Sequence, residues 1–333
     1  LDELERAFRD TDVEPPVTPQ ERADFEQVAK LMFTPAGTEK ALVLLEKSVA
    51  KAVDKNGRST SSALYDFTIG SIYFQQDNLE AAAGWYGKAV EKLPSFLRAQ
   101  KNLGLVYVRS NAFDRAIGPL TRAIDLGAAD GLTYGLLAHS YCMTERYVAA
   151  ESAYRLAMML QPESKDWEIG LVRCLFKEKK FEEAAALCGD MIRRDPAKTD
   201  LWMLQANAWL SLRQPLKAAE NFEVLDRSGC ATVSCLNTLG DIYMNEGVPE
   251  MAASAYQRAL LKDAEHAEAP LFLWKVEVLA ARGAYAEADS LLKRVKEACG
   301  DRMGNADKMR VLKLEARVAA ATGQDDEQQA KLL

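Results

Sequence analysis

The segment LEAAAGWYGKAVEKLP, residues 79–94, decides the fold because its order of small and bulky side chains returns at a fixed interval. Ala82, Tyr86 and Ala89 stand four and three residues apart, which places them on one face of a helix. Pro94 follows, where it cannot continue the helical hydrogen bonding. The same order returns in FDRAIGPLTRAIDLGA at 113–128 and in YVAAESAYRLAMMLQP at 147–162. The sequence is therefore built from copies of one helical unit of 34 residues.

Six copies follow one another over 63–266 without insertion or deletion. With Ala82 numbered as position 20, this position is alanine in every copy: Ala82, Ala116, Ala150, Ala184, Ala218 and Ala252. Positions 8 and 27 are mostly small, and positions 11 and 24 are mostly bulky. Helices approach closely only where side chains are small, so the pattern predicts pairs of antiparallel helices. An accidental match among alanine-rich helices would not keep six alanines in register. The fourth copy, with Val172 and Cys188, departs most from the pattern, which leaves its packing open.

These residues resemble the tetratricopeptide repeat in unit length and in the order Gly/Ala, aromatic, Ala, aromatic, Ala, Pro. Trp202 at position 4 of the fifth copy adds to the resemblance. The resemblance implies an all-α fold, a right-handed superhelical solenoid of antiparallel helix pairs with helical caps at both ends. Terminal units of such solenoids are atypical because they cover the open end of the core.

The expected domain organisation has four parts. Residues 1–18 are expected to be a flexible leader, 19–62 an N-terminal helical pair and linker, and 63–302 the repeat array. The repeats are expected at 63–96, 97–130, 131–164, 165–198, 199–232, 233–266 and, after a two-residue insertion, 269–302. Residues 303–333 are expected to be a capping helix or the start of a further repeat.

Composition excludes some classes of function. The chain has 333 residues, a net charge of −7 and a pI of about 5.2, which argues against a nucleic-acid partner. No apolar run reaches the length of about 18 residues that a membrane span requires. The first residue is Leu1, so the compartment is open: cytoplasmic, or exported or periplasmic if a signal peptide preceded it. Cys230 and Cys235 flank an expected turn, and a disulfide between them is one alternative.

The resemblance also implies a ligand site, because positions 2, 5, 9, 12 and 13 of each unit face the concave groove in that family. Carried over to this chain, the expected peptide-binding groove contains Phe67, Phe74, Arg98, Lys101, Leu105, Arg109, His139, Met143, Arg173, Phe176 and Lys177. This surface begins apolar and becomes basic, which suits a peptide with apolar anchors and carboxylates. The alternative is that the charges form a solvated helix face and the aromatic residues form core between repeats.

Catalytic, metal and cofactor sites are not expected. His139 and Cys142 stand three residues apart on one helix, but without further ligands they are interpreted as a histidine beside a buried thiol. His266 falls in a connecting loop without an obvious partner. Family members that bind heat-shock chaperones use a carboxylate clamp, which needs asparagine where this chain has Leu105. Such a clamp is therefore not expected.

The sequence thus favours a non-enzymatic protein–protein interaction scaffold that binds a peptide or protein in the concave groove. Two alternatives stay open. In the first, the chain is the repeat arm of a larger enzyme, or of a secretion or outer-membrane assembly machine, with the working domain outside this segment. In the second, the chain associates with itself as a homo-oligomer through its apolar terminal helices.

Overall fold

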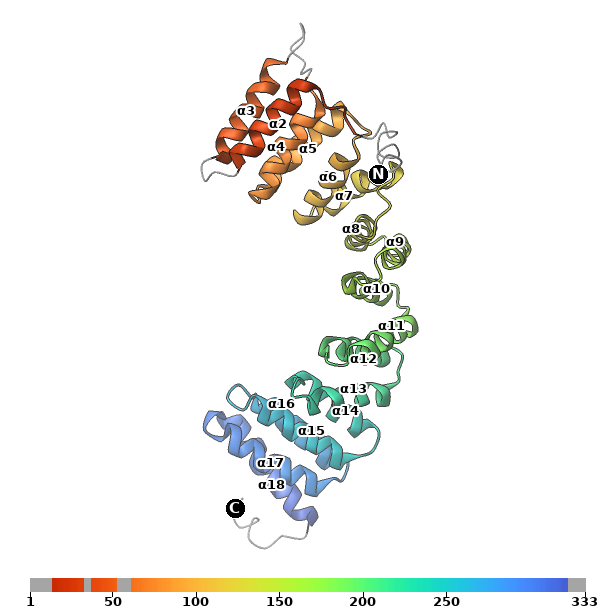
Figure 1. Ribbon diagram of the computed structural model, residues 1–333. Coiled ribbons are helices and arrows are strands. Elements are labelled where there is room, and N and C mark those ends of the chain that lie inside the picture. The colour runs from red at the N-terminus through yellow and green to blue at the C-terminus, as the bar shows by residue number, and fades with distance from the viewer. Residues whose placement is uncertain (1–13, 33–36, 53–60, 323–333) are drawn as a thin grey trace. The chain divides into compact units, whose positions relative to one another are not determined.

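The computed structural model describes residues 14–32, 37–52 and 61–322, and every regular element in these ranges is a helix (Figure 1). Residues 1–13 of the expected leader and residues 323–333 at the end of the chain lie outside the described residues. The described helices fall into two compact units, 1–179 and 180–333. Within each unit, successive helices pack against one another as antiparallel neighbours. The predicted all-α solenoid of helix pairs is confirmed.

The first unit begins with a helix pair that precedes the repeats and ends with the first helix of the fourth repeat. Its helices are α2 (Pro19–Met32), α3 (Gly37–Lys51), α4 (Ala63–Gln75), α5 (Leu79–Lys92), α6 (Leu97–Arg109), α7 (Phe113–Asp125), α8 (Gly131–Met143), α9 (Tyr147–Leu160) and α10 (Lys165–Lys177). Helix α3 contacts α4, and Val28, Ala41 and Leu45 share a core with Ile69 of the first repeat. The pair α2–α3 therefore covers the apolar end of the repeat array.

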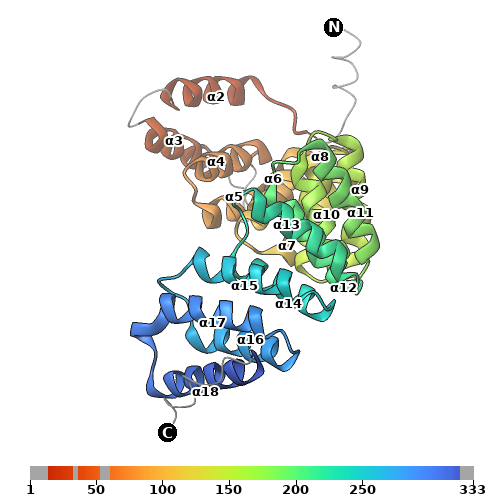
Figure 2. The ribbon, with the colours of Figure 1, turned by 90° about the horizontal axis from the view of Figure 1, so that it is seen from below.

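The second unit begins with the second helix of the fourth repeat. Its helices are α11 (Phe181–Arg194), α12 (Thr199–Ser211), α13 (Pro215–Arg227), α14 (Val233–Asn245), α15 (Pro249–Lys262), α16 (Ala269–Ala281), α17 (Tyr285–Cys299), the 3₁₀ helix η1 (Gly300–Arg302) and α18 (Asn305–Thr322). Figure 2 shows α18 at the C-terminal edge, beside α16 and α17, and α18 contacts both helices. Val311, Leu314 and Val318 of α18 are buried in the core of this unit. Helix α18 thus caps the last pair.

In the repeats whose two helices belong to one unit, the alanine at position 20 explains how closely the helices approach. Ala82, Ala116, Ala150, Ala218 and Ala252 have no solvent-accessible surface, and neither does Ala288, the corresponding residue of the seventh repeat. Position 8 lies against the bulky residue at position 24: a Cβ added to Gly70 would be 2.9 Å from the Tyr86 ring, and one added to Gly240 would be 2.3 Å from the Tyr256 ring. Small and bulky side chains therefore interlock across each of these pairs.

The turn between the two helices of a repeat has one conformation throughout the array. Position 15 has a positive φ in all seven repeats: Asp77 60°, Asn111 57°, Glu145 62°, Lys179 61°, Arg213 56°, Gly247 78° and Gly283 82°. The next N–H donates back to the carbonyl at position 11, as from Ala112 to Tyr107 at 2.8 Å and from Gln214 to Trp209 at 2.9 Å. This is the Schellman ending of a helix, in which one left-handed residue satisfies carbonyls that the helix leaves unpaired.

Candidate peptide-binding groove

All eleven residues of the expected groove lie in the first unit, on the first helices of repeats one to four. Phe67 and Phe74 lie on α4, Arg98, Lys101, Leu105 and Arg109 on α6, His139 and Met143 on α8, and Arg173, Phe176 and Lys177 on α10. Helix α8 contacts both α6 and α10, so these first helices are spatial neighbours. Their bonding partners show which side chains are committed within the chain and which are available to a ligand.

Phe67 belongs partly to the core between repeats. Its ring centre lies 5.5 Å from that of Tyr86 and 5.0 Å from that of Phe96, and both of those residues are buried. On its open side, the guanidinium carbon of Arg98 lies 5.1 Å from the Phe67 ring centre. Arg98 also forms an ion pair with Glu14, with 2.7 Å between Nη2 and Oε2. Phe67 therefore packs against buried aromatic rings on one side and contacts the exposed Arg98 on the other.

Arg109 and Lys101 are also ion-paired within the chain. The guanidinium carbon of Arg109 lies 4.9 Å from the Phe74 ring centre, and its Nη2 lies 2.8 Å from Oδ1 of Asp77. Lys101 Nζ lies 2.7 Å from Oδ2 of Asp130, which caps the N-terminus of α8. Burial tends to raise the pKa of Asp130, but hydrogen bonds from Lys101 and the helix N-terminus outweigh it and lower that pKa. Asp130 therefore stays ionised and holds Lys101 in place.

Arg173 and Lys177 differ from these three cations. Both are exposed on α10, one helical turn apart, and neither forms an ion pair with a carboxylate among the residues that the structure describes. Facing them is α8, where His139 is half-buried and packs edge-on against the Phe113 ring at 5.2 Å. Burial, together with the charge of Arg173, lowers the pKa of His139. His139 is therefore neutral near pH 7, and the positive charge here comes from α10.

Sequence reasoning missed that tyrosines at position 24 reach through the helix pair toward position 9. The Tyr86 hydroxyl lies 3.1 Å from Ser71 Oγ and accepts a hydrogen bond from Asn102 at 3.3 Å. The Tyr256 hydroxyl donates to Asp241 at 2.7 Å. Position 9 was expected to face a ligand, but in these repeats it also anchors a core tyrosine. The coincidence of tyrosine at 24 with a polar residue at 9 was the available signal.

A buried lysine in the second unit was also missed. Lys275 on α16 is 3% exposed; its ammonium contacts the Asp241 carboxylate and lies 5.0 Å from the Tyr256 ring centre. The same ammonium lies 4.7 Å from the ring of Trp274. A buried cation needs such partners, because desolvation without them is costly. Lys275 therefore joins repeats six and seven as a structural element.

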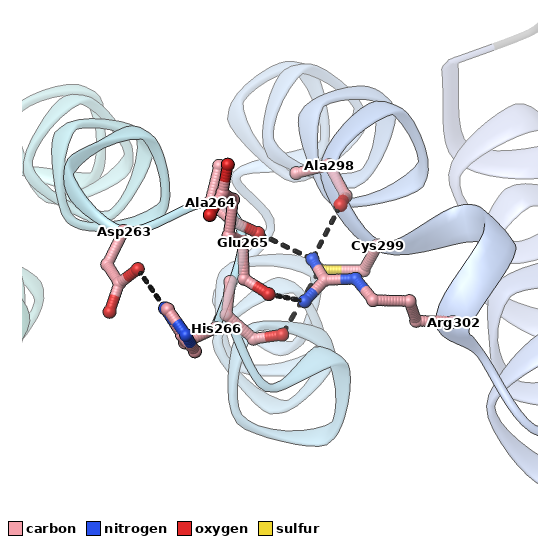
Figure 3. Close-up of polar contacts among 8 residues, drawn as sticks. Asp263, Ala264, Glu265, His266, Ala298, Cys299 and Arg302 are labelled. Carbon is pink, nitrogen blue, oxygen red and sulfur yellow. Dashed lines mark hydrogen bonds and ion pairs between the residues drawn. The ribbon is translucent and has the colours of Figure 1, made fainter.

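His266 does have a partner, contrary to the expectation for it. Its Nδ1 lies 2.8 Å from Asp263 Oδ1, at the start of the connection between α15 and α16 (Figure 3). The Arg302 guanidinium closes the same connection by donating to three backbone carbonyls, those of Ala264, Glu265 and Ala298. The histidine thus belongs to an interhelical loop held by Arg302.

Metal-binding clusters and membrane-spanning helices are both absent from the residues that the structure describes. Within 14–32, 37–52 and 61–322, no three His, Cys, Asp or Glu side chains are grouped so that they would hold a metal ion. None of the helices described there combines the length and apolar character that a bilayer crossing requires. All six cysteines are free thiols, so Cys230 and Cys235 are not bridged.

The stacked helix pairs define a class, the helical-repeat scaffolds. Family models for the tetratricopeptide repeat match residues 67–131, 143–208 and 236–268. The chain is a tetratricopeptide repeat protein, with six in-register repeats and a degenerate seventh. Repeats of this family indicate a protein–protein interaction scaffold.

Known proteins with similar sequence or structure cover different parts of the chain. Rat serine/threonine-protein phosphatase 5 is 32% identical over 129 residues, which are 38% of this chain and 26% of the phosphatase. The chain thus matches about a quarter of the length of that relative. The C-terminal part of a repeat-containing protein from Cytophaga hutchinsonii covers 73% of this chain and 98% of its own, with a TM-score of 0.57 and 13% identity. YrrB, described as a TPR protein with an unusual peptide-binding site, covers 55% of this chain and 91% of its own, with a TM-score of 0.47 and 20% identity.

Proposed function

We propose that the chain binds a peptide or protein partner along the first helices of repeats one to four. The observation that carries this proposal is the pair of exposed cations on α10, Arg173 and Lys177, which have no carboxylate partner in the described ranges. Met143, with 53% of its surface exposed, offers an apolar contact on the neighbouring helix α8. A ligand with carboxylates and an apolar anchor complements this surface.

The ion-paired cations on α6 extend the same surface. The pairs Arg98–Glu14 and Arg109–Asp77 are exposed, and exposed pairs contribute only about 0–1 kcal/mol each. A carboxylate on the ligand therefore replaces Glu14 or Asp77 at little cost. Arginine stacked on an aromatic ring is a frequent anchor of binding energy in interfaces. The complete ligand is thus an extended or helical segment that is acidic and carries apolar residues.

The experiment compares two charge-reversal variants of equal size. The groove variant is Arg98→Glu, Arg173→Glu and Lys177→Glu. The control variant is Lys88→Glu, Arg122→Glu and Arg155→Glu, which changes the second helices α5, α7 and α9 by the same total charge. Both are tested by fluorescence anisotropy against acidic peptides that contain leucine or phenylalanine, with circular dichroism as the folding check.

We expect the groove variant to lose at least tenfold in affinity, while the control variant retains binding. Similar losses of affinity in both variants would show that binding depends on the net charge of the chain and not on the groove residues. Full binding by a folded groove variant would exclude this surface and place the ligand elsewhere on the chain.

A second candidate function rests on the comparison with phosphatase 5. The similarity covers only 26% of that enzyme, so the repeats are a part of a larger protein there. We propose as the alternative that this chain is likewise the repeat arm of a larger enzyme or of an assembly machine. The mass of the native protein from its source tests this directly. A mass near that of this chain, 36.8 kDa, would exclude it.

Self-association is the third candidate, and helix α9 supplies the observation that favours it. Val148 and Met159 are 72% and 78% exposed, and Leu156 and Leu160 are exposed on the same helix. Large exposed apolar side chains that gather on one element are typical of interfaces. Sedimentation equilibrium of the chain and of a Val148→Ser/Met159→Ser variant tests this. A monomeric parent chain would rule out self-association.

A further inference from the structure

A hollow lies between the second helices α13 and α15 of the second unit, and Tyr243 of α14 forms part of its wall. Two adjoining parts of this hollow enclose about 350 and 460 Å³, and both are lined by Glu223, Arg227 and Tyr243. We propose that the Tyr243 hollow binds an arginine side chain of a protein partner. The guanidinium lies over the Tyr243 ring, beside the carboxylates of Glu220 and Glu250.

The corresponding hollow in the first unit holds an arginine of the chain itself. It lies between the second helices α5 and α7, encloses about 490 Å³, and is lined by Tyr107 and Arg115. The guanidinium carbon of Arg115 lies 4.4 Å from the Tyr107 ring centre, and its Nη2 donates to the Tyr107 hydroxyl at 2.8 Å. Tyr107 is position 11 of repeat two, and Arg115 is position 19. The first unit thus shows how an arginine occupies a hollow of this kind.

The Tyr243 hollow has the tyrosine but lacks the arginine. Tyr243 is position 11 of repeat six, whereas position 19 is Met251, which is 44% exposed. The ring of Tyr243 carries no stacked cation among the residues that the structure describes. Leu216 of α13 lines the same hollow and is 54% exposed. Leu216 and Met251 therefore offer an apolar contact to residues that flank the arginine of the partner.

The Tyr243 hydroxyl can accept a hydrogen bond from the ligand. It donates to Glu223 Oε1 at 3.0 Å, which leaves the lone pairs of the phenolic oxygen for a donor. Burial, together with the Glu223 carboxylate, raises the pKa of Tyr243 to about 12, so the hydroxyl keeps its proton at neutral pH. A ligand guanidinium over this ring thus repeats both contacts that Arg115 makes with Tyr107: the stacking and the hydrogen bond.

The charges around the hollow favour a cation at the end where α13 and α15 begin. Glu220 in the first half of α13 and Glu250 in the first turn of α15 are exposed, and neither forms an ion pair within the described ranges. Arg258 is already held by two carboxylates of α13, with its Nη2 and Nε 3.3 and 2.8 Å from their oxygens.

Arg227 is the remaining cation of the hollow, and it lies in the last turn of α13. Because successive helices are antiparallel, α13 and α15 run in the same direction (Figure 1). Arg227 is therefore at the opposite end of the hollow from Glu250. The ligand of this hollow is basic, whereas the ligand proposed for the groove of the first unit is acidic.

The test measures the fluorescence anisotropy of the labelled peptide fluorescein-Ala-Ala-Leu-Arg-Leu-Ala-Ala-amide with the full chain. A control peptide carries citrulline, which keeps the shape of arginine without its charge. We expect the citrulline peptide to bind at least about tenfold more weakly, and Glu220→Gln/Glu250→Gln to weaken binding of the arginine peptide by a similar factor. The control variant Glu182→Gln/Asp200→Asn removes two exposed carboxylates of α11 and α12 and should bind like the parent chain.

A second variant fills the hollow from within the chain. Met251→Arg places an arginine at position 19, as Arg115 is placed in repeat two, and should abolish binding of the arginine peptide. Met309→Arg adds the same charge at an exposed methionine of α18 and should bind like the parent chain. Circular dichroism verifies that each variant is folded.

The proposal is overturned if the parent chain does not bind the arginine peptide, or if folded Met251→Arg binds it like the parent chain. Equal binding of the citrulline peptide would show an apolar contact alone and overturn it as well. Tighter binding of a peptide with glutamate in place of arginine would assign the hollow to Arg227, with the same consequence. The groove of the first unit is tested with acidic peptides and other residues, so the two proposals fail separately.

Discussion

Substitution of Gly240 by alanine tests how closely the two helices of a repeat interlock. A Cβ at this position would lie 2.3 Å from Cε1 and 2.5 Å from Cδ1 of Tyr256. Ordinary contact begins at about 3.4 Å, so the ring must move by about 1 Å. Tyr256 is buried and its hydroxyl is bonded to Asp241, which restrains that movement. Overpacking of this kind costs about 1–3 kcal/mol.

The matched control is Gly84→Ala on α5, where nothing lies within 4 Å of an added Cβ. Alanine in place of glycine inside a helix gains about 1 kcal/mol, and both variants share this gain. We therefore expect the control to become more stable by about 1 kcal/mol. Gly240→Ala should be less stable than the control by about 1–3 kcal/mol.

Thermal unfolding followed by circular dichroism measures the difference, with about 2–4 °C expected for each kcal/mol. Repeat three already places Ala138 at position 8 and Tyr154 at position 24, so one helix pair accommodates a methyl group. If α14 and α15 relax to the same spacing, Gly240→Ala will be as stable as Gly84→Ala. That result would refute the interlocking argument for the sixth repeat.

Four further substitutions test other parts of the structure. Arg213→Gly should raise the free energy of unfolding by about 0.5–1 kcal/mol, because glycine adopts the left-handed conformation at φ 56° without strain. Gly247→Ala should lower the free energy of unfolding by a similar amount. Thermal melts that show no difference would contradict this. Ala150→Leu should cost about 1–3 kcal/mol, because Ala150 has no accessible surface, and an unchanged melting temperature would contradict the position-20 alignment. Burial raises the pKa of Asp66 above 3.8 despite Lys92, so the folded chain binds more protons in the window just above pH 3.8. The free energy of unfolding should therefore fall as pH rises through this window and then level off, whereas Asp66→Asn should remove that slope in pH-dependent urea titrations.

The helix pairs could be predicted from sequence because their packing depends on residue size at fixed spacing. Alanine at position 20 and a bulky residue at 24 determine which faces meet, and both are visible in the sequence. The left-handed turn was not predictable at Glu145, Lys179 or Arg213, since these residue types do not favour positive φ. There, the hydrogen bonding that ends the first helix imposes the conformation, whereas the residue type itself favours it at Asp77, Asn111, Gly247 and Gly283.

The positions of the proposed groove residues could be predicted from the sequence, but the ion pairs that these residues form could not. Arg98 pairs with Glu14, which is 84 residues away, so the pair depends on where the segment before α2 lies. The assignment of the groove residues as a ligand site stays a prediction.

Arg302 has a consequence for how this array changes over evolutionary time. In the connection between α15 and α16, its guanidinium donates hydrogen bonds only to main-chain oxygens, those of Ala264 and Glu265 (Figure 3). The contact with Arg302 therefore places no demand on the side chains of Ala264 and Glu265, because any residue supplies the same oxygen. This contact depends on the single side chain of Arg302, so the sequence of the loop can change while its hydrogen bonds to Arg302 persist.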